Sequence, residues 1–114
     1  MPRLYFASPR DLVTVEPQPG MRRRLVQSDR STVAVTELDP KTVIETHKHA
    51  VEEIGIVTKG SLVMVIAGEQ RILTAGDTYR VPENASHGAR VLEAPTQVTE
   101  IWSPSRADGA RATT

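Results

Sequence analysis

The 114-residue sequence contains no cysteine. Disulfides, thiolate metal ligands and a cysteine nucleophile are therefore excluded, and the composition is compatible with a reducing cytoplasm. No apolar run approaches the roughly 20 residues of a membrane-spanning helix. The first residues also lack the apolar core of a signal peptide. We therefore expect a cytoplasmic protein that has no membrane partner.

The sequence also lacks an excess of charge of either sign. The 14 Lys and Arg residues balance the 14 Asp and Glu residues, which gives a formal net charge of zero. A balanced chain has no overall field that would attract nucleic acid or an anionic membrane, so we expect a small-molecule substrate and no nucleic acid. A chain of this length supports one hydrophobic core. We predict a single domain over residues 1–106.

Long helical segments are absent as well. No window of about twelve residues keeps an apolar period of 3.6 without a proline or glycine. Turn residues recur along the whole chain, and short strands between regular turns are typical of an all-β sandwich or barrel. Strands are expected at residues 32–38, 42–49, 54–58, 61–67, 70–74, 77–81, 89–92 and 97–102.

The two ends of the chain depart from this strand pattern. Residues 1–8 are expected to form an extended arm that ends before Pro9. Such an arm commonly pairs with a strand edge or with a neighbouring subunit, which favours a homodimer. Residues 107–114 are small and polar, and we expect a flexible tail there.

All three histidines of the chain fall into one pattern. His47 and His49 are separated by one residue, the adjacent carboxylates Glu52 and Glu53 follow, and His87 comes later in the chain. Imidazole nitrogens and carboxylate oxygens are the ligands that divalent transition metals prefer. We therefore predict one divalent transition metal ion, Zn, Ni, Fe or Mn. Four protein ligands leave coordination positions open for a substrate.

Strand alternation brings the first two imidazoles together. Every second side chain of residues 42–49 shares a face, so one face carries Val43, Glu45, His47 and His49. The turn after His49 resets the register. Alternation therefore leaves the choice between Glu52 and Glu53 open.

The spacing of these residues resembles the two sequence motifs of the cupin family. The first motif is matched by His47, His49, Glu53 and Gly60, and the second by Gly76, Pro82 and His87. The resemblance implies a cupin jelly-roll barrel, and it selects Glu53 as the fourth ligand beside His47, His49 and His87. Lys41 and Asn84 stand where the motifs have glycine. Because asparagine tolerates a positive φ, we expect the turn at Asn84 to survive.

A narrower resemblance lies in the segments that begin at Glu53, Gly76 and Ile101. These segments resemble small single-domain cupins of the pectin-degradation (KdgF) type, which linearise unsaturated uronate sugars. The resemblance implies a metal-dependent, isomerase-like or lyase-like enzyme that opens the ring of a sugar acid and tautomerises it. It also assigns catalytic roles to Glu100 as acid or base, to Trp102 as the aromatic residue, and to Arg106 as a clamp for a substrate carboxylate.

Three positions differ from the pattern of that group. The group usually carries Gln at the position of Glu53, Asp at the position of Glu100, and Phe at the position of Trp102. A carboxylate at position 53 changes the net charge of a bound metal and so its Lewis acidity. The identity of the substrate is therefore left open.

Other candidate residues and functions also remain open. Arg22 to Arg24 and Arg80 are further candidate contacts for an anion, and the sequence does not fix the face of Tyr79. The same ligand set would suit a polyketide cyclase with zinc or an iron-dependent dioxygenase. A cupin that binds a small ligand without catalysis is the alternative from a different class.

Overall fold

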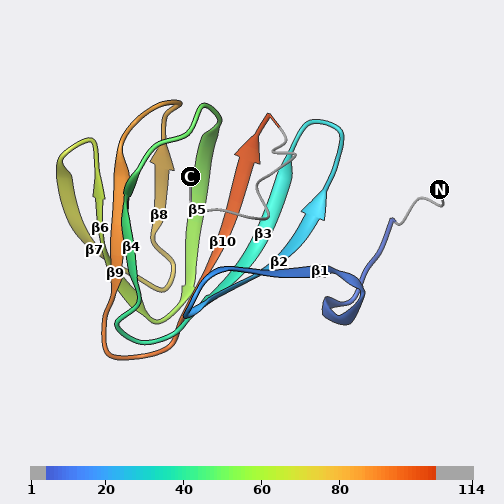
Figure 1. Ribbon diagram of the computed structural model, residues 1–114, viewed down its shortest axis with the longest axis horizontal. Coiled ribbons are helices and arrows are strands. Elements are labelled where there is room, and N and C mark those ends of the chain that lie inside the picture. Colours follow the sequence, from blue (N-terminus) through green and yellow to red (C-terminus); the bar gives the residue numbers. More distant parts are fainter. Residues whose placement is uncertain (1–4, 105–114) are drawn as a thin grey trace.

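The computed structural model describes residues 5–104, which form two antiparallel β-sheets that face each other (Figure 1). The six-stranded sheet has the order β1 (Val13–Gln18), β2 (Met21–Gln27), β3 (Thr32–Leu38), β10 (Thr96–Ser103), β5 (Glu52–Lys59) and β8 (Thr78–Val81). The four-stranded sheet has the order β4 (Val43–His47), β9 (His87–Val91), β6 (Ser61–Ile66) and β7 (Glu69–Thr74). The predicted all-β cupin jelly roll is confirmed.

Helix is confined to one short segment within residues 5–104, the 3₁₀ turn Pro9–Asp11. No helix in this part of the chain is long and apolar enough to cross a membrane. The expected arm lies only partly within the described range, where residues 5–8 have no regular structure. Arg106 and the expected tail at 107–114 lie outside it.

Each of the eight expected strands is present, with ends shifted by one or two residues in most cases. The two amino-terminal strands, β1 and β2, were not expected from the sequence. Pro17 lies within β1, which is tolerated because β1 is an edge strand and its pairing with β2 is irregular between Val15 and Gln18. In β2, Met21, Arg23 and Leu25 face the interior in alternation with more exposed residues.

The core lies between the two sheets. Both sheets contribute buried side chains to it, among them Val57 and Val98 from the six-stranded sheet and Leu62 and Val91 from the four-stranded sheet. A smaller buried cluster forms around Trp102. Burial of these apolar groups stabilises the facing sheets, and each fully buried side chain contributes about 1.5–3 kcal/mol.

Strand β4 contains a bulge that changes which side chains face the core. Its pairing with β9 shifts register between Ile44 and His47, so Ile44 packs against the core and His47 lines the interior pocket. Val43 and Glu45 are exposed. The expectation that these two residues share the face of His47 is wrong, because the extra residue of a bulge resets the alternation. The strand also ends at His47, so His49 lies in the following loop.

The two positions that depart from the cupin motifs both adopt a left-handed backbone. Lys41 has a φ of 65° and Asn84 has a φ of 63°. The turn expected at Asn84 is therefore formed without glycine. Asparagine accepts this conformation more readily than lysine does.

Candidate metal centre and its pocket

Three imidazoles converge from separate parts of the fold. His47 ends β4, His49 follows in the loop, and His87 begins β9, where it pairs directly with His47. One ring nitrogen from each residue lies within 4.8 Å of the others. The bulge in β4 and the turn before β9 thus bring His87 to the same point as His47 and His49, which precede it by about 40 residues.

Backbone carbonyls fix the tautomer of all three rings. Nδ1 of His47 lies 2.7 Å from the carbonyl oxygen of Glu45. Nδ1 of His49 lies 2.8 Å from the carbonyl oxygen of Val51, and Nδ1 of His87 lies 3.1 Å from that of Ala85. A carbonyl oxygen only accepts, so each Nδ1 carries the hydrogen and each neutral ring presents a lone pair on Nε2. Burial lowers the pKa of His47, which favours the neutral, ligating form.

Glu53 brings a carboxylate to the same point. Its Oε1 atom lies 3.3 Å from Nε2 of His49 and 3.9 Å from Nε2 of His87. The side chain is 3% exposed, and it accepts hydrogen bonds from the Tyr79 hydroxyl at 2.6 Å and from the Trp102 indole at 2.8 Å. Burial raises the pKa of Glu53, but the hydrogen bonds that it accepts from Tyr79 and Trp102 act in the opposite direction, and the net pKa is lowered to about 2.

These donors fit a divalent metal ion. The buried Nε2 atom of His49 has no hydrogen-bond partner, although it lies beside a carboxylate oxygen that is itself an acceptor. A lone pair and a carboxylate facing each other without a hydrogen between them repel, and an intervening cation removes the repulsion. Three imidazole nitrogens and one carboxylate oxygen form a donor set that suits zinc, nickel, iron and manganese.

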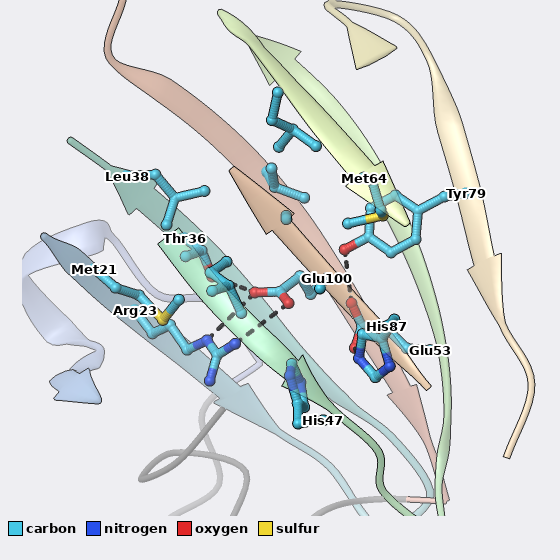
Figure 2. Close-up of a pocket in the computed structure, with 15 residues that line it drawn as sticks. Met21, Arg23, Thr36, Leu38, His47, Glu53, Met64, Tyr79, His87 and Glu100 are labelled. Carbon is cyan, nitrogen blue, oxygen red and sulfur yellow. Dashed lines mark hydrogen bonds and ion pairs between the residues drawn. The ribbon is translucent and has the colours of Figure 1, made fainter. Parts of the chain in front are cut away.

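The centre opens onto a small pocket between the sheets (Figure 2). The pocket volume is about 30 Å³, which is room for only one or two water molecules. Aliphatic side chains and methionines line much of it, and its polar lining residues are Arg23, Thr36, His47, Glu53, Tyr79, His87 and Glu100. Only the reacting end of a sugar-sized ligand would therefore fit inside.

A second buried carboxylate, that of Glu100, also lines the pocket. The Glu100 carboxylate accepts two hydrogen bonds from Arg23, each of 3.3 Å, and one from the Thr36 hydroxyl (Figure 2). Burial, opposed by Arg23 and Thr36 and assisted by the negative charge of Glu53, raises the pKa of Glu100 to about 7. Glu100 is thus a buried carboxyl group that faces the pocket.

Two candidate residues from the sequence, Trp102 and Arg80, do not line the pocket. Trp102 is 0% exposed and does not line the pocket, but it binds Glu53 and lies under Arg23, whose guanidinium carbon is 5.0 Å from the ring centre. Arg80 is exposed on β8 and does not line the pocket.

Two pocket residues were not singled out from the sequence. Arg23 was one of three adjacent candidate arginines, and the face of Tyr79 was open. The signal for Arg23 is its position between Met21 and Leu25, since alternation puts all three on one face of a strand. For Tyr79 the signal is the spacing from Val81, which is also buried.

Comparisons with known proteins agree with this fold. Residues 34–102 match the cupin domain family. The chain belongs to this family, as its motifs predict. It is 36% identical over 91 residues to the pectin degradation protein KdgF of Dickeya dadantii (strain 3937), a match covering 78% of this chain and 83% of that protein.

Another similar protein is the H2HPP isomerase of Bacillus subtilis, which is 33% identical over 88 residues. That match covers 76% of this chain and 36% of the longer protein. Among solved structures, KdgF from Halomonas sp. superposes with a TM-score of 0.85 at 27% identity, covering 93% of this chain and 98% of that one. An RmlC-like cupin from Shewanella frigidimarina gives the same TM-score at 21% identity, with coverages of 93% and 96%.

Proposed function

We propose that this protein is a metal-dependent enzyme that opens the ring of a small sugar acid, such as an unsaturated uronate, and tautomerises the product. The observation that carries this proposal is the pocket itself. A buried carboxyl group, held by Arg23 and Thr36, and members of a metal donor set line the same small cavity. Acid–base isomerisation can use both: a metal that polarises a substrate oxygen and a carboxyl group that transfers a proton.

His47, His49, His87 and Glu53 would hold the metal. When bound, a divalent ion supplies Lewis acidity that polarises a hydroxyl or carbonyl oxygen of the substrate. The imidazoles are already in the ligating tautomer, and Glu53 offsets part of the charge of the ion. Because ring opening involves no net oxidation, zinc, nickel and manganese suit it as well as iron does.

Glu100 would move the proton. Opening a cyclic hemiacetal removes a proton from the anomeric hydroxyl, breaks the bond between the anomeric carbon and the ring oxygen, and returns a proton to that oxygen. An enol formed in this way becomes a ketone when a proton leaves its oxygen and another joins the neighbouring carbon. No atoms are gained or lost, so a single buried carboxyl group can serve each transfer.

Cationic groups would bind the substrate carboxylate. Arg23 lines the pocket, where its Nε and Nη2 atoms donate to Glu100, and its positive charge would attract a substrate carboxylate. Arg106, outside the described residues, keeps its proposed role as a clamp for the substrate carboxylate. We assign Trp102 a positioning role, because it holds Glu53 and contacts Arg23 without lining the pocket.

The relatives support this class of reaction. One is named a pectin degradation protein and another an isomerase. Pectin is built from uronate sugars, so an unsaturated uronate is a suitable first substrate to test.

The test is turnover of an unsaturated uronate, followed by the loss of ultraviolet absorbance of its conjugated double bond. Glu100→Gln should lower kcat by about 10²–10⁴-fold, which is the usual contribution of a positioned acid or base. Glu52→Gln, which changes an exposed carboxylate on the same sheet, should leave kcat unchanged. Both variants should retain metal.

Turnover should also be the same with and without dioxygen. Equal activity of Glu100→Gln and the wild type would contradict the assigned role. Activity that requires dioxygen would replace isomerisation with oxygenase chemistry.

A further inference from the structure

The two oxygens of the Glu53 carboxylate have different neighbours. Oε1 faces the imidazoles, 3.3 Å from Nε2 of His49, and accepts a hydrogen bond from Trp102. Oε2 accepts a hydrogen bond of 2.6 Å from the hydroxyl of Tyr79 (Figure 2). Only one oxygen of the carboxylate is therefore directed at the candidate metal centre.

Tyr79 reaches this oxygen because of a glycine on the neighbouring strand. Gly55 pairs with Tyr79 across β5 and β8, and it shares a face with Glu53 two residues earlier. A Cβ atom at position 55 would overlap Cε2 and Cζ of the Tyr79 ring. The backbone of Gly55 is not in the left-handed region, so the close approach of the ring is what requires glycine here.

The hydroxyl of Tyr79 acts as the donor in this hydrogen bond. The side chain is 9% exposed, and its oxygen lies 2.6 Å from a carboxylate oxygen, which only accepts. A hydrogen bond to an ionised carboxylate is of the stronger, charge-assisted kind.

We propose that Tyr79, admitted by Gly55, is a positioning residue that makes Glu53 a metal ligand through Oε1 alone. A carboxylate that binds through both oxygens occupies two coordination positions. By holding Oε2, Tyr79 leaves the second position free for a substrate oxygen. This inference rests on the proposed metal site. It adds to that site the binding of Glu53 through a single oxygen and the roles of Tyr79 and Gly55.

The test uses the protein loaded with Co²⁺, whose visible spectrum reports coordination number and whose titration gives an affinity. Tyr79→Phe keeps the ring and removes the hydroxyl. Its affinity for Co²⁺ should fall by about 10–100-fold, the usual effect of losing a group that orients a metal ligand. Its visible absorption should weaken, because freeing Oε2 raises the coordination number.

Two further variants control for stability and for the role of glycine. Thr96→Val removes a hydroxyl that is hydrogen-bonded, 1% exposed and outside the pocket, so it should lower stability and leave affinity and spectrum unchanged. Gly55→Ala keeps the tyrosine but displaces its ring, so it should reproduce the spectrum of Tyr79→Phe. This second variant also serves if Tyr79→Phe does not fold.

The outcomes separate the two proposals. A wild-type protein that binds no Co²⁺ would overturn the metal site itself. If the wild type binds Co²⁺ and Tyr79→Phe gives the same affinity and spectrum, the metal site stands and the role of Tyr79 is wrong. A wild-type spectrum for folded Gly55→Ala would remove Gly55 from the account.

Discussion

Glu53 is the residue on which most contacts of the centre meet. Its carboxylate is 3% exposed, receives two hydrogen bonds and stays ionised, because its pKa is held at about 2. No Lys or Arg forms an ion pair with it within residues 5–104. Buried ionised groups are stable when a cation compensates them, and a divalent metal is the cation that the surrounding imidazoles can hold.

Replacing Glu53 by Gln tests how much the negative charge matters. The amide oxygen can take the place of Oε1, and the amide nitrogen can donate to the Tyr79 hydroxyl, so the variant should fold. Metal affinity should fall by about 10–100-fold, comparable to other losses at a metal centre. A competition titration against a chromogenic chelator measures it.

The control for this variant is Glu53→Ala, which removes the oxygen as well as the charge and should bind metal more weakly still. Affinity for Glu53→Gln equal to that of the wild type would show that the carboxylate charge does not act on the metal.

At the residue scale, spacing predicted which side chains meet, but not how they are held. The positions of the three histidines and Glu53 follow from two short motifs. Arg23 and Tyr79 could not be chosen in advance, because their roles depend on contacts across strands. Tyr79 reaches Glu53 only because its partner across β5 and β8 is Gly55.

At the scale of elements, alternation and turns predicted most of the strands. Strand β3 was predicted at its observed bounds. Strands β1 and β2 were missed because Pro17 and three consecutive arginines hide the apolar alternation of Met21 and Leu25. Alternation also failed in β4, since a bulge depends on pairing with β9 and leaves no mark in a single strand.

The turns between strands differ in how strictly they need glycine. Gly60 has a φ of 78° and Gly68 a φ of 85°, so both are left-handed. A Cβ atom at Gly60 would overlap Thr96 and the Pro95 carbonyl, whereas nothing lies within 4 Å of the same position at Gly68. The two glycines thus share a left-handed backbone and differ in the atoms that surround the position of a Cβ atom.

Alanine substitutions at these two turns should therefore differ in cost. Gly68→Ala should lower the free energy of unfolding by about 1–2 kcal/mol through the left-handed backbone alone. Gly60→Ala should lose about 1–3 kcal/mol more, because the methyl group must displace backbone atoms. Denaturant titration of the metal-free variants measures both, and equal losses would contradict the packing described at Gly60.

At the scale of the whole molecule, two facing sheets enclose one polar site within an apolar core. The six-stranded sheet supplies Glu53, Glu100, Arg23 and Tyr79, and the four-stranded sheet and its loop supply the three histidines. The site therefore forms only when both sheets have paired. Metal binding should stabilise the whole fold, by about 2.7 kcal/mol when the free metal is at 100 times its Kd.

The oligomeric state remains a prediction. Tyr5 is 81% exposed and Phe6 is 92% exposed, at the end of the chain that the sequence predicts to be an arm. Two large aromatic side chains held in solvent are consistent with a contact to a second copy of the chain.

The metal site is the central claim, and elemental analysis of the purified protein tests it most directly. After reconstitution and removal of excess ion, the wild type should hold about one divalent transition metal ion per chain. His49→Ala should hold none, with its β-sheet circular dichroism preserved, because it removes one of the three converging imidazoles. A wild-type chain that stays free of metal, or a His49→Ala variant that keeps full occupancy, would contradict the account.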